Sequence, residues 1–149
     1  MKQIIYVMRF KGQAAPVAGS ATVIKATTSA PSCTVTTTVG PDGVGAVLTP
    51  NAGGNAYFES EVRITGETSF LESGSIRFGD VNHVLRFCTV GQGYLGASPD
   101  PKIKSGAVTW RIEDGEGQFK GANGYITSNF TLDEAGAVID HHFGVIFVR

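Results

Sequence analysis

The sequence predicts an all-β protein, a single antiparallel β-barrel of about eight strands. Apolar and polar residues alternate with a period of two in nearly every segment, which is the pattern of strands that bury one face. No window of ten or more residues combines helical periodicity with capping residues. The chain also contains 20 glycines, as expected of many strands joined by turns. A closed barrel satisfies all three observations.

Length and composition predict one domain, residues 1–149, with a substantial apolar interior. A chain of 149 residues buries roughly two-thirds of the surface that it exposes when unfolded. Hydrophobic residues make up 42% and charged residues 17%, and the net charge is -1, which argues against disorder. No excess of Lys and Arg is available to neutralise phosphates, so we expect no nucleic-acid partner.

The N-terminal residues 1–10 are interpreted as a first strand. Their apolar run is broken by Arg9 and is too short to span a bilayer, and no signal-like cleavage region follows. We therefore expect no membrane partner and a cytoplasmic location. Cys33 and Cys88 lie far apart and have no metal-ligand spacing, so we expect two reduced thiols rather than a disulfide.

Turn and loop signals divide the chain into strands. Pro41-Asp42-Gly43 is a turn, because Pro presets φ and Asp-Gly accepts left-handed positions. Further turns are predicted at 79–80 and 133–136, and loops at 12–20, 50–55 and 91–105. The predicted strands cover residues 1–10, 21–28, 33–39, 44–48, 57–65, 68–71, 75–78, 83–90, 107–113, 125–132 and 137–148.

The stretch from Gly115 to Tyr125 is predicted to organise the fold. It holds four glycines and one large apolar side chain, Phe119, and an alternating run follows it. Glycine takes positive φ without strain, so the pattern predicts a tight turn between two strands. We expect Phe119 to plug one end of the barrel, and Gly121 or Gly124 to hold a conformation that alanine tolerates poorly.

This stretch, Gly-Glu-Gly-Gln-Phe-Lys-Gly-Ala-Asn-Gly-Tyr, resembles the Gly-x-Gly-x-Phe-x-x-Ala-x-Gly pattern of the allene oxide cyclase and dirigent superfamily. The resemblance is strongest over residues 108–149, where the final hairpin has the same layout, and it extends to a predicted hairpin at residues 71–76. It implies a calycin-like barrel of eight strands with an apolar cavity, often dimeric or trimeric. Members steer the cyclisation or coupling of reactive small molecules without a cofactor. No catalytic residue is carried over, because the family's catalytic positions are not found in the N-terminal half.

Two histidines are candidate catalytic residues. His141 alternates with Ile139, Phe143, Val145 and Phe147, which predicts that its strand face is buried. A neutral imidazole in an apolar pocket is suited to proton transfer, and the alternative is a core histidine bonded to a neighbouring strand. His83 shares a face with Leu85 and Phe87 and has the same two interpretations.

Glu59 is the third candidate catalytic residue, and it shares one strand face with Glu61 and Arg63. If this face points inward, Arg63 would hold one carboxylate charged while burial raises the pKa of the other. If it points outward, the three are solvated surface charges whose ion pairs contribute little.

The predicted ligand-binding residues are Arg63, Tyr125, Asn129 and Phe143. Tyr125 and Asn129 share a face of the strand after the glycine turn, where a hydroxyl and an amide would orient a ligand carbonyl. An outward-facing Tyr125 at a subunit contact is the alternative. We expect no metal, because the three histidines lack a short ligand spacing.

Two functions stay open. The first is a cofactor-free isomerase or cyclase that orients a small apolar molecule inside the barrel. The second is a non-catalytic binding or carrier barrel for a hydrophobic ligand. An enzyme of the first kind requires a buried titratable residue beside the ligand, whereas a carrier does not, and a filled barrel would support neither. Strands that are apolar on both faces, such as residues 145–148, also predict a homo-oligomer, dimer or trimer.

Overall fold

The computed structural model describes all 149 residues, which form nine strands and one short 3-10 helix. The elements are β1 (Lys2–Pro16), β2 (Val23–Gly40), β3 (Gly43–Ile64), β4 (Ser69–Phe78), β5 (Val84–Thr89), β6 (Gly93–Ala97), β7 (Ile103–Gly115), η1 (Gly117–Phe119), β8 (Asn123–Asp133) and β9 (Ala137–Val148). All strand pairs are antiparallel. The predicted all-β class is confirmed, and the one helix is too short to cross a membrane.

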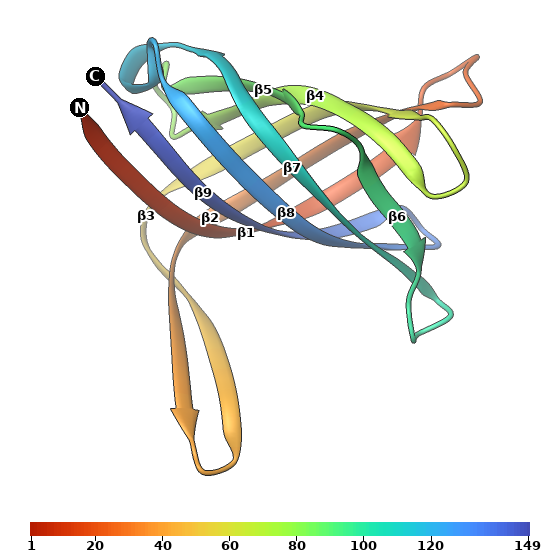
Figure 1. The fold of residues 1–149 in the computed structure, drawn as a ribbon, viewed down its shortest axis with the longest axis horizontal. Coiled ribbons are helices and arrows are strands. Elements are labelled where there is room, and N and C mark those ends of the chain that lie inside the picture. Colours follow the sequence, from red (N-terminus) through yellow and green to blue (C-terminus); the bar gives the residue numbers. More distant parts are fainter.

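The strands close into a ring. Their order is β3-β2-β1-β9-β8-β7-β5-β4, and a further pairing of β3 with β4 completes a barrel of eight strands (Figure 1). The short ninth strand, β6, bridges β4 and β7 beyond the end of β5. Closure leaves one interior, and the alternating side chains of each strand fill it from all sides.

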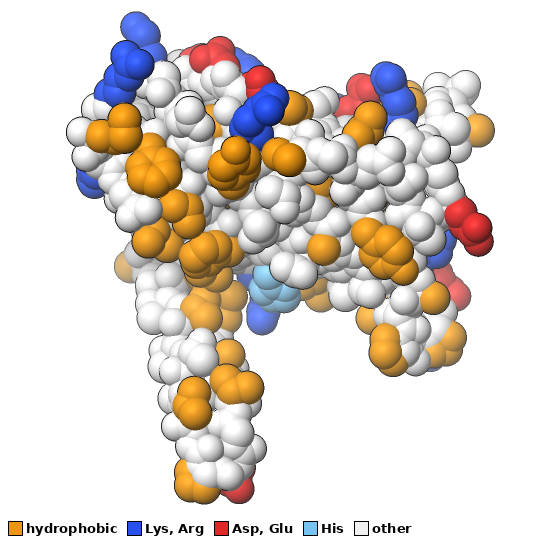
Figure 2. Space-filling model, in the orientation of Figure 1, with side chains coloured by type: hydrophobic (Ala, Val, Ile, Leu, Met, Phe, Trp, Pro, Cys, Tyr) orange, Lys and Arg blue, Asp and Glu red, His pale blue; other side chains and the backbone are white.

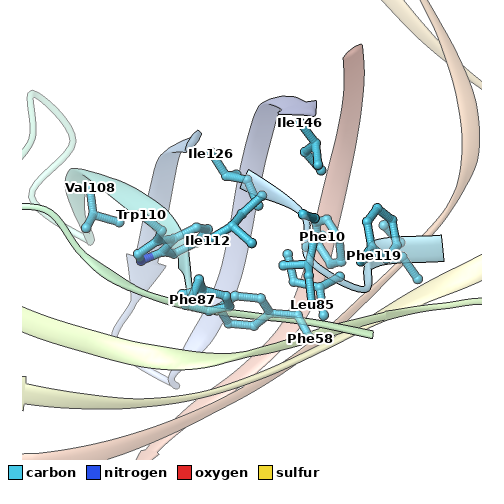
Figure 3. Close-up of a cluster of buried hydrophobic side chains, with 14 of the residues drawn as sticks. Phe10, Phe58, Leu85, Phe87, Val108, Trp110, Ile112, Phe119, Ile126 and Ile146 are labelled. Atoms are coloured by element: carbon cyan, nitrogen blue, oxygen red, sulfur yellow. The ribbon is translucent and has the colours of Figure 1, made fainter. Parts of the chain in front are cut away.

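Aromatic side chains fill one half of the interior (Figure 3). The rings of Phe58 and Phe87 stack with centroids 5.5 Å apart, and Trp110 packs 4.5 Å from Phe87. Phe10 lies 6.1 Å from Phe58. All four are at most 2% exposed, so this half is a packed core rather than a cavity.

Phe119 closes one end of the barrel, as predicted. It is 3% exposed and its ring centroid lies 5.2 Å from that of Phe78. Gly124 has φ +141, and a Cβ there would lie 2.2 Å from the Val145 carbonyl oxygen. An alanine at Gly124 would therefore meet both backbone strain and a clash, which confirms the predicted requirement for glycine.

Several predicted loops are strand. β1 continues to Pro16, β3 runs unbroken through residues 50–55, and β6 lies within the predicted loop at 91–105. The predicted hairpin at residues 71–76 is also wrong, because Gly74 is inside β4, paired with Ser60 and Phe87. A Cβ on Gly74 would lie 2.2 Å from the Glu59 carbonyl oxygen, so this glycine permits a close strand approach rather than a turn.

Beyond the barrel wall, β2 and β3 continue as a two-stranded arm. The register is interrupted between Pro31 and Cys33, and the two strands then pair from Cys33–Pro50 to Gly40–Gly43. Figure 1 shows this arm projecting away from the barrel, with the Pro41-Asp42-Gly43 turn near its tip. Cys33, at its base, and Cys88 are both free thiols.

Replacing Phe119 with alanine should lower the free energy of unfolding by about 3–5 kcal/mol, because a fully buried ring is removed and a cavity remains. Chemical denaturation measures the loss. Lys120→Ala, at the exposed neighbouring position, is the control and should change stability little. A loss below roughly 1 kcal/mol in Phe119→Ala would contradict the plug.

Candidate active site

Six polar residues lie within the otherwise apolar interior of the barrel: Thr28, Ser60, Glu72, Ser128, Asp140 and His142. Burying a polar group is costly unless the group is hydrogen-bonded, so each of these needs a partner or a reason to lack one. All except Thr28 belong to two hydrogen-bonded networks, one around Glu72 and one around Asp140. Both carboxyl groups line the same cavity.

The cavity lies at the end of the barrel opposite Phe119. Its walls include Ala14 on β1, Phe70 on β4 and Val138 on β9, and eleven of its fourteen lining residues are hydrophobic. Its volume is about 60 Å³. A single water requires about 10–15 Å³, so the cavity holds several waters or one small functional group. A larger molecule would have to leave its remaining part at the rim.

Glu72 is 8% exposed and accepts two side-chain hydrogen bonds. Ser60 Oγ donates to Oε2 over 2.6 Å, and Trp110 Nε1 donates to Oε1 over 3.1 Å. Burial raises the pKa of Glu72 to about 7; the bond from Ser60 opposes the rise, the charge of Asp140 adds to it, and the bond from Trp110 opposes it. At neutral pH the carboxyl group therefore populates both protonation states, as a proton-transfer group requires.

The backbone around Glu72 is held by Thr89 on β5. The Glu72 N–H donates to Thr89 Oγ1 over 2.7 Å, and the same hydroxyl donates to the Glu72 carbonyl oxygen over 2.9 Å. This reciprocal pair continues the contact between β4 and β5 past their last backbone pair, Ser73–Cys88. It fixes the position from which the Glu72 side chain enters the cavity.

Asp140 accepts bonds at both carboxylate oxygens. Ser128 Oγ donates to Oδ1 over 2.6 Å, and His142 Nε2 lies 2.9 Å from Oδ2. Because a carboxylate only accepts, His142 carries a proton on Nε2. Its ring is stacked on Phe10 at 4.2 Å, and Nδ1 is buried without a partner. The stacking and the bond to Asp140 together fix the imidazole.

Thr28 adds a third polar group to the cavity wall. Its side-chain hydroxyl is buried and has no hydrogen-bond partner in the protein. An unsatisfied buried hydroxyl costs stability, and a ligand oxygen or nitrogen would satisfy it. The cavity thus offers two carboxyl groups and one uncommitted hydroxyl within an apolar wall.

His141 lies on the outer face of β9 and does not line this cavity. Arg9 Nε donates to His141 Nε2 over 3.0 Å, and burial, with the Arg9 charge next, lowers the pKa of the imidazole. The prediction that its strand face is buried is wrong. The inner face of β9 carries Asp140, His142 and Ile146 instead. β9 is apolar on both faces, so its pattern did not fix which face is buried.

Glu59 does not reach the cavity wall, because the structure has the second of its two predicted orientations, in which Glu59, Glu61 and Arg63 are surface charges. Glu59 and Arg63 are exposed on the outer side of β3, while Phe58 and Ser60 on the same strand are buried. His83 is half-buried at the other end of the barrel, where its Nδ1 accepts the Gln118 N–H over 3.0 Å. There it supports the turn that holds Phe119.

The predicted ligand-binding residues Tyr125, Asn129 and Phe143 are exposed on the outer faces of β8 and β9. Asn129 and His141 do come together, because they are cross-strand partners that line a hollow of about 450 Å³ on the outside of the barrel. Arg63 is not part of that hollow. The predicted set is therefore not gathered at the interior cavity.

Glu72, Asp140, Thr28 and His142 were missed by sequence reasoning. A signal was present for Glu72 and Thr28, because their neighbours two residues away are apolar or small, Phe70 and Gly74 for Glu72 and Ala26 and Ala30 for Thr28. Asp140 and His142 are neighbours of each other at that spacing, so the pattern did not mark them. No group of three or more His, Cys, Asp or Glu side chains lies close enough to hold a metal ion. Comparison with family models, curated proteins and solved structures gave no match to this chain.

Glu72 should make stability depend on pH. Its pKa is raised from 4.5 to about 7 in the folded state, so its stabilising contribution is full below about 4.5 and is lost as the pH rises through about 7. The total loss is roughly 3 kcal/mol, measured by denaturation across this range. Glu72→Gln should remove this loss, and Glu59→Gln, an exposed control, should retain it. An unchanged profile in Glu72→Gln would contradict the assignment.

Proposed function

We propose that the protein is a cofactor-free isomerase or cyclase that acts on a small apolar molecule whose reactive group enters the barrel beside Glu72. One observation carries the proposal: a buried carboxyl group with a pKa near neutrality lies on the wall of an otherwise apolar cavity. A carrier has no need of such a group, whereas a proton-transfer enzyme does.

The proposed reaction moves a proton within the substrate. Ionised Glu72 removes a proton from one atom of the bound molecule, and the protonated carboxyl group returns it to another, so nothing is consumed. The Thr28 hydroxyl would donate a hydrogen bond to an oxygen on which negative charge develops. The apolar wall orients the molecule, which lowers the entropic part of the barrier.

The charges of the cavity favour a neutral reactive group. Glu72 and Asp140 line it, and no Lys or Arg does, so an anionic group would be repelled without compensation. A volume of about 60 Å³ admits only a small group, such as a hydroxyl or carbonyl with its adjoining carbons. The rest of the molecule would lie against the partly exposed side chains of Leu95, Phe130 and Leu132.

A carrier barrel is the second candidate, and one observation favours it. Both carboxylate oxygens of Glu72 already accept bonds from the protein, from Ser60 and from Trp110. A carboxyl group satisfied in this way can be purely structural. The cavity would then bind an apolar ligand without turnover.

A carboxylate-activated probe reaction tests the proposal. In 5-nitrobenzisoxazole, a base removes the ring C–H proton while the N–O bond breaks, which gives a nitrile phenolate and leaves the proton on the base, without any co-reactant. Turnover by the wild type should fall at least about 100-fold in Glu72→Gln. It should rise with pH through about 7, as Glu72 ionises. Glu59→Gln is the matched control and should keep the wild-type rate.

Binding of the probe is followed separately by the emission of Trp110, the single tryptophan, which contacts Glu72. If the emission changes on binding but no turnover depends on Glu72, the carrier is favoured. Equal turnover in the wild type and Glu72→Gln would contradict the enzymatic proposal.

A further inference from the structure

The arm formed by residues 33–40 of β2 and 43–50 of β3 has no third strand beside it and no core of its own. It consists of eight cross-strand pairs, from Cys33–Pro50 to Gly40–Gly43. Such an isolated two-stranded hairpin is at best marginally stable in water. A surface that packs against the arm would therefore stabilise its two strands.

The two faces of the arm differ. Cross-strand partners point to the same side, so Val35–Leu48, Thr37–Ala46 and Val39–Val44 form one face. The other face carries mainly threonines, at positions 34, 36, 38 and 49. Val39 is 84% and Val44 is 75% exposed. The arm thus has the alternating pattern of a sheet with one buried face, and its apolar face is uncovered.

The outside of the barrel carries a second uncovered apolar surface, the outer apolar patch, on β1, β8 and β9. Its members are Ile5, Val7, Tyr125, Phe143 and Phe147, each exposed by 37% or more. They are contiguous through the register, because Val7 pairs with Phe143, and Ile5 and Tyr125 flank Val145. Figure 2 shows hydrophobic side chains gathered on the barrel above the arm.

The arm stands at the edge of this patch with its apolar face turned toward the same side. A hollow of about 380 Å³ lies between the arm and β1, and it is lined by Arg9 and Lys11 on the outer side of β1 and by Leu48 and Pro50 on the arm. At the base, Cys33 Sγ donates to the Val7 carbonyl oxygen over 3.3 Å. Arm and barrel therefore meet at a concave corner whose base is lined by charged as well as apolar side chains (Figure 2).

We propose that two copies of the chain exchange arms, so that the apolar face of each arm packs on the outer apolar patch of the other. A second copy of the chain fits these surfaces, because each chain carries both the apolar arm face and the outer apolar patch. A two-fold axis then places the arm of each copy on the patch of the other. Neither the apolar face of the arm nor the outer apolar patch contains a charged residue, and Arg9 and Lys11 line the hollow where the arm meets β1. The only charged residue in 33–50 is Asp42, at the tip.

The area that such an exchange buries favours a closed pair. Eight residues of strand extend about 25 Å, and two strands are about 10 Å wide, so one face covers about 250 Å². One arm on one patch buries about 500 Å², whereas reciprocal exchange buries about 1,000 Å², the lower limit of a specific interface. A ring with one arm contact at each interface would fall short of it.

This assembly is independent of the proposed reaction. The base of the arm, at Ser32 and Gly54, lies beside Phe119, and the cavity with Glu72 lies at the opposite end of the barrel. Exchange of arms therefore leaves the cavity mouth uncovered by the arm, and either proposal can fail without the other.

The mass in solution tests the exchange. At micromolar concentration the wild type should have twice the 15.6 kDa mass of one chain by light scattering. Val35→Lys with Val39→Lys, on the apolar face, should give single chains. Thr36→Lys with Thr38→Lys adds the same charge to the same strand on the other face and should leave the pair intact. Phe143→Lys, which alters the patch instead of the arm, should also give single chains.

Far-ultraviolet circular dichroism checks that each variant keeps its strands. If the arm variants lose their strands, the mass of Phe143→Lys decides whether the pair depends on the outer apolar patch. A wild type with the mass of one chain or of three would overturn the proposal. A pair that survives both Val35→Lys with Val39→Lys and Phe143→Lys would overturn it as well.

Discussion

Closure of the ring between β3 and β4 is the constraint on which the rest of the structure depends. Nine backbone pairs, from Ala56–Phe78 to Ile64–Phe70, join the two strands, and Gly74 lets them approach beside Glu59. Without this seam the sheet would have two open edges and two solvent-exposed faces. With it, Ser60 on β3 and Trp110 on β7 both donate hydrogen bonds to Glu72 on β4 inside a single interior.

The interior is divided between packing and polarity. Around Phe119 and the stacked aromatic rings it is filled, which stabilises the barrel by burying apolar surface. Toward the other end it contains two carboxyl groups and an unpaired hydroxyl, polar groups whose burial costs stability unless they are hydrogen-bonded. Buried polar groups that are concentrated at one end of a small core indicate a functional site, because packing alone would favour apolar residues there. The cavity end is therefore where a reaction is proposed.

The sequence predicted the fold well because the strand period and the glycine turn are local signals. Phe119 and Gly124 could be identified from residues 115–125 alone. The candidate site could not be identified in this way. The inward face of β9 is set by its pairing with β1 and β8, and the sequence of one strand does not reveal that pairing. His141 alternates with the more apolar residues of β9, yet Asp140 and His142 face inward. There Asp140 accepts a hydrogen bond from Ser128, and the His142 ring stacks on Phe10. Glu72 is the one polar residue among Phe70, Gly74 and Ile76 on the inward face of β4, and only closure explains its burial.

Direct titration of Glu72 tests whether the pKa of its carboxyl group suits proton transfer, and it needs neither a substrate nor an assembly. In protein labelled with ¹³C at glutamate side-chain carboxyl carbons, the resonance absent from Glu72→Gln belongs to Glu72, and its chemical shift reports ionisation. The midpoint is expected near pH 7, well above the ordinary 4.5. A midpoint at or below 4.5 would show that the carboxylate is charged throughout the neutral range, and it would contradict a proton-transfer role for this residue.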